Sequence, residues 1–333
     1  MEFLKDAVPL IAGFLAAVLL GKVLIPWLHK VKFGQHIRED APETHRKKAG
    51  TPTMGGFIFI LGTIASSLVN HVWRKTTPSS LEVSVLALYC LMGLVGFLDD
   101  YRKIRRGRNL GLRAREKLAY QILIAGAFMW FVATTGRGTA VVIPFSGKAL
   151  DLGFLYGVFG VFVIVGMANG VNLTDGLDGL AGSVVAEGLA AYYPVALAAA
   201  GALGIPSLSP LVAGSVGAIL GFLVYNRHPA RVIMGDIGAL ALGGLLSGIA
   251  VVTRSELLLL FLAFVPIVEN ITVIMQVISF QLFGKRIFKM TPIHHHFELL
   301  GWDEVRIVRM FRLTAAVAAL LGLFAAASVG LWM

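Results

Sequence analysis

Ten apolar runs, most of them close to 20 residues long, restrict the folds that this chain can adopt more than any other feature. They lie at 7–28, 54–73, 82–98, 118–135, 154–171, 179–200, 208–225, 237–253, 257–280 and 312–332. A helix needs roughly 20 apolar residues to cross a bilayer, and only helices and closed barrels satisfy their backbone polar groups in lipid. We therefore expect an all-α, polytopic integral membrane protein with about ten transmembrane helices, forming one domain over residues 1–333.

The composition and the ends of the first run agree with this expectation. Hydrophobic residues make up 57% of the chain and charged residues only 14%, which excludes an ordinary soluble domain. Glu2 and Asp6 precede the first run and a basic loop follows it, so we interpret the run as a retained helix rather than a signal peptide. Alternating apolar residues between glycines predict a small β-hairpin at 136–152.

The positive charge of the chain is unevenly placed. A net charge of +10 is compatible with nucleic-acid binding, but 22 of the 29 Lys and Arg residues fall in four alternate connections, 29–53, 99–117, 226–236 and 281–312. Cytoplasmic loops of membrane proteins carry such an excess. We therefore expect these four segments in the cytoplasm, both termini outside, anionic lipid as a neighbour, and no nucleic-acid partner.

Two aspartates close the third apolar run in GFLDDYRK. Asp99 and Asp100 stand at a membrane edge, where carboxylates are costly, and at a predicted helix C-terminus, where the macrodipole disfavours negative charge. A catalytic or ligand-binding role explains this placement. The structural alternative is a pair of solvated residues neutralised by Arg102 and Lys103.

Two further motifs carry aspartates beside apolar runs. In NGVNLTDGLDGLAG, Asn172, Asp175 and Asp178 recur every third position and are predicted on one face of a helix start; helix capping is the alternative and explains one of the three. In RVIMGDIGALALGG, Asp236 precedes the eighth run, where it suits an N-cap. Its carboxylate also suits Mg²⁺, which takes one or two carboxylates and leaves positions for substrate phosphates.

Two loops add basic and imidazole groups. HRKKAGTPTMGG at 45–56 joins Lys47 and Lys48 to a glycine- and threonine-rich turn, which predicts anion binding or, alternatively, contact with anionic lipid. PIHHHFELLGW holds three consecutive histidines, which cannot all face one metal without an extended or turning backbone. With no cysteine nearby, we favour phosphate binding or proton transfer over zinc for His294, His295 and His296.

Five segments, KKAGTPTMGG, GFLDDYRK, NLTDGLDGLAG, MGD and PIHHHFELLGW, occur in an order that is similar to one known family. The chain resembles the phospho-N-acetylmuramoyl-pentapeptide transferases, within the polyprenyl-phosphate N-acetylhexosamine-1-phosphate transferase superfamily, over nearly its whole length. The aspartate motifs resemble the superfamily as a whole. PIHHHFE with the following Gly-Trp resembles the muramoyl-pentapeptide branch.

The resemblance implies an activity and a setting. Members transfer phospho-N-acetylmuramoyl-pentapeptide from its UDP carrier to undecaprenyl phosphate, forming lipid I and releasing UMP, which is the first membrane step of peptidoglycan synthesis. It also implies Mg²⁺ as cofactor, ten transmembrane helices with a cytoplasmic active-site cleft, a homodimer, and a place in the bacterial cytoplasmic (inner) membrane.

The resemblance also implies roles for individual residues. The expected catalytic residues are Asp99, Asp100 and Asp236, the last as magnesium ligand, together with His294, His295 and His296 on the loop that closes over the site. The expected substrate-binding residues around the nucleoside-sugar pocket are Lys48, Thr53, Asn172, Asp175, Asp178, Asn226 and Ile233. Lys103 and Lys117 are expected to supply positive charge to the anionic substrates.

The chain departs from the family pattern at three places. Ile233 stands where the family usually has an aromatic residue near the uracil site, and Ala239 where it often has serine. Met310, Phe311 and Arg312 replace the usual Arg-Phe-Trp. Loss of the aromatic ring weakens base stacking, but none of these changes removes a carboxylate.

Two other functions compete with this one. A polyprenyl-phosphate N-acetylglucosamine-1-phosphate transferase would share the aspartates but is expected to lack the PIHHHFE loop. A transporter or magnesium channel would also carry intramembrane carboxylates, but near the bilayer midplane on broken helices. The aspartates of this chain are predicted at the ends of helices.

Overall fold

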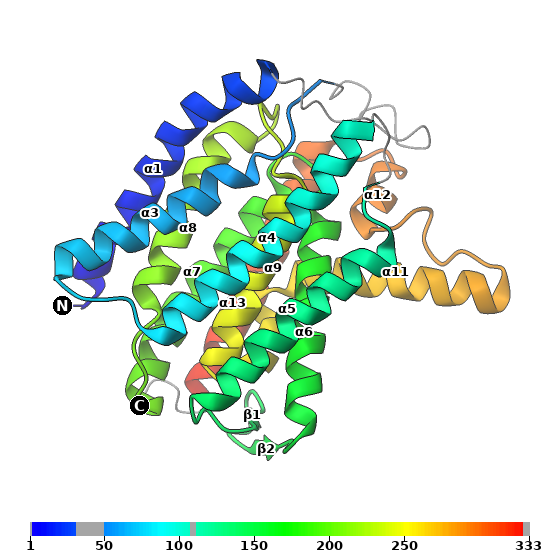
Figure 1. Cartoon of the computed structure of the whole chain (residues 1–333). Helices are drawn as coiled ribbons and strands as arrows, with labels where there is room; N and C mark the ends of the chain where they lie inside the picture. Colours follow the sequence, from blue (N-terminus) through cyan, green and yellow to red (C-terminus); the bar gives the residue numbers. More distant parts are fainter. Residues whose placement is uncertain (1, 31–49, 107–110, 329–333) are drawn as a thin grey trace.

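The computed structural model describes residues 2–30, 50–106 and 111–328, and its helices lie side by side in a bundle (Figure 1). The long helices are α1 (Glu2–Lys30), α3 (Gly56–Arg74), α4 (Ser80–Arg106), α5 (Ala114–Thr134), α6 (Leu155–Thr174), α7 (Leu180–Leu203), α8 (Ser209–Asn226), α9 (Gly235–Val252), α11 (Phe264–Phe283) and α13 (Glu304–Ser328). In the described part of the chain, ten helices are long and apolar enough to cross a membrane. The predicted all-α, multi-pass membrane architecture is confirmed.

Helix α9 forms the centre of the bundle. Its sequence is apolar on every side and rich in glycine and alanine, and every residue from Ile237 to Val252 is buried, as expected for a helix enclosed by others. Helices α4, α6 and α3 contact it. Asp236 lies in the first turn of this enclosed helix, and therefore at one end of it.

Helix α1 is tied to its neighbours through a buried carboxylate. Asp6 accepts hydrogen bonds from the hydroxyls of Tyr193 and Ser209 at 2.8 and 2.7 Å, and Arg74 pairs with its other oxygen. The hydroxyl of Ser66 donates to the carbonyl of Pro9 at 2.6 Å. These contacts join α1 to α3, α7 and α8.

The predicted hairpin is confirmed at one end of the bundle (Figure 1). Strands β1 (Ala140–Val142) and β2 (Ala149–Asp151) pair antiparallel, with Val141 opposite Leu150. The start of α1 and the end of α13 lie at this same end, as an even number of crossings requires.

A buried ion pair fastens the hairpin end of the bundle. Arg137 pairs with Glu256 in the 3₁₀ helix η1 (Glu256–Leu258), and the hydroxyl of Tyr156 donates to the same carboxylate. The guanidinium of Arg137 also lies 4.4 Å from the Tyr156 ring centroid. Burial raises the pKa of the Glu256 carboxyl and lowers the pKa of the Arg137 guanidinium.

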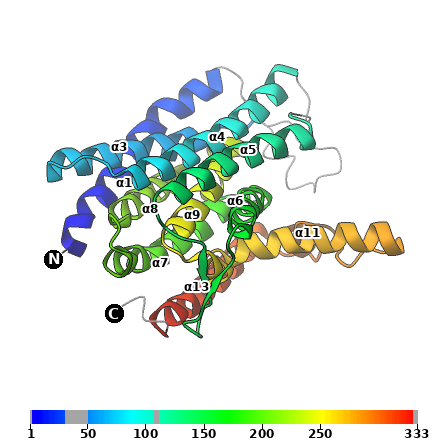
Figure 2. The same ribbon diagram turned by 60° about the horizontal axis from the view of Figure 1, so that its bottom comes forward.

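Three predicted spans differ from the observed helices. The run 257–280 is broken: η1 and the short α10 (Leu259–Leu262) end at Ala263, which adopts a non-helical conformation before α11 begins. Helix α11 then projects away from the bundle in both views (Figures 1 and 2). Helix α13 begins eight residues before the predicted run at 312, and α4 continues eight residues beyond the predicted end at 98, because charged residues extend both helices past their apolar segments.

Candidate active site

Three aspartates from two helices meet at one end of the bundle. Asp99 and Asp100 on α4 and Asp236 on α9 each offer a carboxylate oxygen, and these oxygens lie within 4.8 Å of one another. The helices approach closely because Gly96 faces α9: a Cβ at that position would lie 2.2 Å from the Asp236 carbonyl oxygen. Since α4 continues to Arg106, the prediction that the aspartates end the helix is wrong.

Lys103 lies one turn beyond the aspartate pair and faces all three carboxylates. Its Nζ is 2.6 Å from Asp99 Oδ2, 3.5 Å from Asp100 Oδ1 and 2.9 Å from Asp236 Oδ2. The α-helical spacing of three and four residues places Lys103 on the same face as the aspartates. Arg102, by contrast, pairs with Glu116 at 2.9 Å, so only one of the two expected neutralising residues serves the pair.

Lys117 and Asn172 complete the contacts of Asp236. Lys117 Nζ lies 2.8 Å from Asp236 Oδ2, and Asn172 Nδ2 donates to Asp236 Oδ1 at 2.8 Å. Lys117 also donates to Asn172 Oδ1 at 3.3 Å. These contacts bring α5 and α6 to the site and place Lys103 and Lys117 beside the carboxylates. Their predicted role toward anionic substrates stays a prediction.

Backbone groups fix the orientation of the aspartate pair. The amide of Leu112 donates to Asp99 Oδ1 at 2.7 Å, and the amide of Ile237 donates to Asp100 Oδ2 at 3.3 Å. Thr53 Oγ1 and Asp100 Oδ2 flank Gly235, where a Cβ would lie 2.6 and 2.5 Å from them. Thr53 therefore belongs beside the cluster, although it is distant from Gly235 in sequence.

The donor set fits a divalent cation that prefers oxygen. Three carboxylates, with a formal charge of −3 when ionised, face two lysines, and the carboxylate oxygens converge. Hard cations such as Mg²⁺ are bound by one or two carboxylates and otherwise by water and phosphate oxygens. The cluster can thus bind a metal, and the ammonium of Lys103 sits among the same oxygens.

The Asn172, Asp175 and Asp178 stripe does not lie on a helix start. Asn172 is in the last turn of α6, Asp175 is its C-cap, and Asp178 lies in the turn before α7. Gly179, in a left-handed conformation with no side-chain hydrogen bond, is the N-cap of α7, so the capping alternative is also wrong. For Asp236 too, the N-cap position of α9 is taken by Met234.

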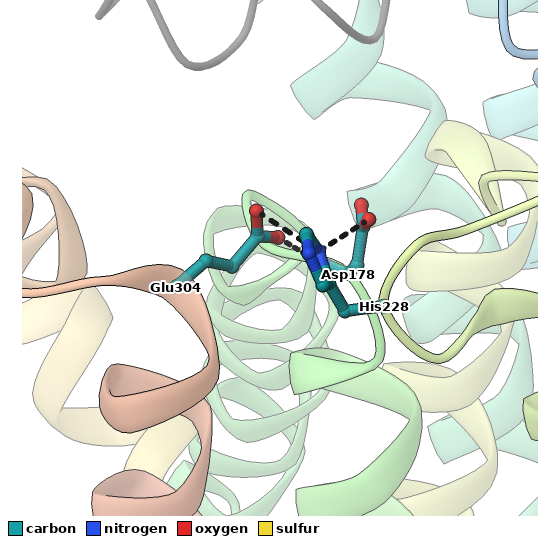
Figure 3. Close-up of side chains that lie close together, drawn as sticks. All are labelled: Asp178, His228 and Glu304. Carbon is teal, nitrogen blue, oxygen red and sulfur yellow. Dashed lines mark hydrogen bonds and ion pairs between the residues drawn. The ribbon is translucent and has the colours of Figure 1, made fainter.

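The turn between α6 and α7 places Asp178 in a second cluster, with His228 and Glu304 (Figure 3). His228 Nδ1 lies 3.3 Å from Asp178 Oδ2 and 3.5 Å from Glu304 Oε2, and the amide of Ala230 donates to Asp178 Oδ2 at 2.9 Å. Asn172 and Asp178 therefore serve different clusters. A cavity of about 520 Å³ opens beside the second one, lined by side chains that include Asp178, His228, Arg227 and Arg309.

The connection from α8 to α9 holds two predicted pocket residues. Asn226 is buried and donates from Nδ2 to the carbonyl of Val232 at 2.9 Å, which closes the turn. Ile233 is 9% exposed, and its amide and carbonyl pair with Pro52 and Gly55 at 2.9 and 2.8 Å. Their predicted contacts with a nucleotide remain predictions.

The glycine- and threonine-rich segment is only partly as expected. Lys48 lies outside the described residues. Gly55 and Gly56 donate their amides to the carbonyls of Ile233 and Met234 at 2.8 and 2.9 Å. Pairing with residues 233 and 234 therefore occupies these two amides, and anion binding by the rest of the segment stays a prediction.

The three histidines on α12 (Ile293–Glu298) point to three different partners. His294 Nδ1 lies 2.9 Å from Glu269 Oε1, and His295 Nδ1 lies 2.6 Å from Glu298 Oε2. His296 Nδ1 accepts the amide of Lys289 at 3.2 Å. These contacts agree with the sequence argument against a shared metal.

Several residues of these clusters were not found from sequence. Glu269 stands inside the ninth apolar run, and an intramembrane carboxylate is in itself a signal of function. His228 and Glu304 carry no comparable local signal. Two residues of the unusual Met310-Phe311-Arg312 run have structural contacts: Arg312 Nε donates to Glu187 Oε1 at 2.7 Å, and Phe311 is buried edge-on against Phe297 of α12.

Comparisons with known proteins place the chain among related sequences. Residues 83–254 match the model of glycosyl transferase family 4, and residues 48–60 match signature 1 of the phospho-N-acetylmuramoyl-pentapeptide-transferases. A relative of that name from Caldanaerobacter subterraneus is 47% identical over 306 residues, covering 92% of this chain and 94% of its own. Relatives of the same name from Desulfitobacterium hafniense and Oceanobacillus iheyensis are 47% and 42% identical, covering 94% and 97% of this chain and 95% and 98% of theirs.

Proposed function

The chain belongs to the phospho-N-acetylmuramoyl-pentapeptide-transferase family, and we propose that Asp99, Asp100 and Asp236, with Lys103 and Lys117, form the centre of its reaction. As an enzyme of this family it transfers phospho-N-acetylmuramoyl-pentapeptide from the UDP carrier to undecaprenyl phosphate. A phosphate oxygen of the lipid bonds to the β-phosphorus of the nucleotide. The bond to UMP breaks, and the lipid-linked diphosphate is lipid I.

The observation that carries this proposal is the convergence of three carboxylates and two lysines from three helices, with Asn172 from a fourth. Both reactants are anionic, so positive charge must offset their repulsion. Lys103 and Lys117 hold their ammonium groups 2.9 and 2.8 Å from Asp236 Oδ2, where they can also contact phosphate oxygens of a bound substrate. Fixed charges of this kind stabilise charge that develops in a transition state.

Asp236 is the proposed magnesium ligand, with Asp99 and Asp100 beside it. Bound Mg²⁺ would neutralise the diphosphate and stabilise the charge on departing UMP. Asn172 holds Oδ1 of Asp236 in place and Lys117 contacts Oδ2. The metal proposal therefore depends on a carboxylate whose direction is fixed by two other helices.

Asp99 is proposed to orient the lipid phosphate or to accept its proton. A phosphate monoester has its second pKa near 6, so much of the carrier is already dianionic at neutral pH and a strong base contributes little. The Leu112 amide and Lys103 hold Asp99 in one orientation. Orientation of the nucleophile is then its larger contribution.

The remaining substrate contacts follow from the family. We propose Thr53, Asn172, Asp175, Asp178, Asn226 and Ile233, with Lys48, as the residues around the nucleoside and sugar. Ile233 would cover the base by apolar contact rather than by stacking. The three histidines of α12 are proposed to act at the sugar-phosphate side of the same pocket.

The setting of the enzyme extends this proposal. The chain is a multi-pass membrane protein; we propose that residues 1–333 form one catalytic domain in the bacterial cytoplasmic membrane, with the aspartate cluster facing the cytoplasm, and that the enzyme is a homodimer. The positive-inside distribution of Lys and Arg supports this orientation. Continuous α4 and α9, which carry the aspartates at one end, argue against a transporter built on broken helices.

Purified protein in detergent with undecaprenyl phosphate tests the proposal. UMP release and a lipid-linked product are expected with UDP-N-acetylmuramoyl-pentapeptide and Mg²⁺. Turnover with UDP-N-acetylglucosamine in its place would instead identify the sister activity. Absence of UMP release with the pentapeptide substrate, from protein that is folded and monodisperse, would refute the proposed function.

A further inference from the structure

A carboxylate and an imidazole form a buried pair outside the aspartate cluster. Glu269 on α11 is 0% exposed and His294 on α12 is 1% exposed. Glu269 Oε1 lies 2.9 Å from His294 Nδ1, and Glu269 Oε2 accepts the backbone amide of Ile293 at 2.7 Å. One side chain of α11 therefore fixes both the backbone and the first imidazole of α12.

With the Glu269 carboxylate ionised, these contacts select the nitrogen of His294 that carries the proton. An ionised carboxylate can only accept hydrogen bonds, and both oxygens of Glu269 are used. The imidazole must therefore donate from Nδ1, and in the neutral ring Nε2 holds a lone pair. A carboxylate that orients a histidine in this way selects one tautomer.

The other nitrogen of His294 has no partner among the residues that the structure describes. Its Nε2 is buried and faces the turn between α6 and α7, where a Cβ on Gly176 would lie 2.1 Å away. Only glycine admits the ring at this distance. A buried polar atom without a partner costs roughly 1–3 kcal/mol of stability. Nε2 of His294 therefore does not stabilise the fold, and packing alone does not explain a histidine at this position.

We infer that Glu269 is a positioning residue, which holds His294 in the Nδ1-protonated tautomer so that the Nε2 lone pair faces the turn formed by residues 175–178. There Nε2 accepts a hydrogen bond from an O–H or N–H group of the nucleotide-sugar substrate when that substrate engages the turn. The identity of this donor rests on the proposed function. Glu269 itself touches no substrate and acts through His294.

Glu269→Gln reverses the tautomer in a predictable way. The Ile293 amide can only donate, so the carbonyl oxygen of the substituted side chain must face it, and the NH₂ group then faces His294 Nδ1. The proton of His294 is expected to move to Nε2, where it removes the acceptor. The change leaves the size of the side chain almost unaltered, so an effect of the substitution reports the tautomer of His294 rather than a change in packing.

The first test reads the tautomer directly. Solid-state NMR of ¹⁵N-histidine-labelled protein in bilayers, with His294→Asn to identify the signal, should show a protonated Nδ1 and an unprotonated Nε2 in the wild type. Glu269→Gln should show the reverse. Glu298→Gln, which alters the neighbouring His295 pair, is the matched control and should leave the His294 signal unchanged. An unaltered His294 tautomer in Glu269→Gln overturns the inference.

The second test measures whether Glu269 and His294 affect turnover through one another. Glu269→Gln and His294→Gln should each lower kcat/KM by about 10–100-fold, by analogy with the outer partners of metal-bound histidines. The double variant should lose no more than the worse single variant. Multiplicative losses, or wild-type kcat/KM in Glu269→Gln, contradict it. If the wild-type enzyme formed no lipid product, the proposed function would fail, while the NMR result would still decide whether Glu269 sets the tautomer.

Discussion

Lys103 Nζ on α4 lies 2.9 Å from Asp236 Oδ2 on α9, across 133 positions of sequence. The same ammonium lies 2.6 Å from Asp99. One lysine therefore links the aspartate pair of one motif to the single aspartate of another. The two motifs form one charged centre only because α4 packs along α9.

Substitution of the aspartates should remove turnover and spare the fold. Asp99→Asn, Asp100→Asn and Asp236→Asn each keep the shape of the side chain but remove a charge, and a loss of about 100-fold or more in kcat is expected, as for other fixed electrostatic groups. Asp303→Asn is the control and should remain active. Asp303 is exposed, and its Oδ1 accepts the backbone amide of Arg306. Near-normal kcat in Asp236→Asn would exclude its role as metal ligand.

Removal of magnesium should stop the reaction reversibly. Three carboxylates are an all-oxygen donor set, which suits Mg²⁺ or Mn²⁺ rather than Zn²⁺. After treatment with a chelator, UMP release should return on addition of Mg²⁺ and should not return with Zn²⁺ alone. Full activity in the presence of excess chelator would contradict a metal-dependent step.

Gly96→Ala should separate the two helices that carry the site. The added Cβ would lie 2.2 Å from the Asp236 carbonyl oxygen, so α4 and α9 must move apart, and overpacking of this kind costs about 1–3 kcal/mol. A lower Tm with reduced kcat is expected. Gly126→Ala on α5, where no atom lies within 4 Å of the new Cβ, provides the matched control; equal Tm values for the two variants would argue against close packing at Gly96.

The ion pair at the hairpin end should matter for stability alone. Arg137→Met removes the ion-pair partner of buried Glu256 and leaves only the weaker charge interaction with Arg254. Loss of one partner of a buried pair costs about 3–5 kcal/mol. The double variant Arg137→Met with Glu256→Leu should recover part of this loss in thermal unfolding. If the double variant were less stable than Arg137→Met, the uncompensated charge would not be the cause of the instability.

Cysteine labelling should establish which end of the bundle faces the cytoplasm. In a Cys90→Ala background, single cysteines at Arg106 and Lys289 should react with an impermeant reagent only in inverted membrane vesicles, because basic loops stay inside. A cysteine at Ser146, which lies between the two hairpin strands, should react only from the outside of intact cells. The reverse pattern would overturn the proposed orientation and the cytoplasmic site.

The crossing of the membrane was predictable because it depends on local properties. A span needs length and hydrophobicity, and both can be read from a single stretch of about 20 residues, so the ten runs were predictable. The hairpin predicted at 136–152 followed from the local alternation of apolar residues between glycines. The ends of α4 and α13 were not predicted, since both helices continue into charged residues such as Arg106 and Glu304 that lie beyond the apolar core.

The sequence by itself therefore determined the fold class, the family and the kinds of group at the site, since these reside in composition, local periodicity and motifs. Only the tertiary structure decided which of these groups contact one another. Asn172 turns to Asp236 while Asp178 turns to His228, and Glu269 meets His294 across 25 positions. The physical reason is that these partners are selected by packing between helices and by the direction of each turn, and neither is encoded in the spacing of residues within one segment.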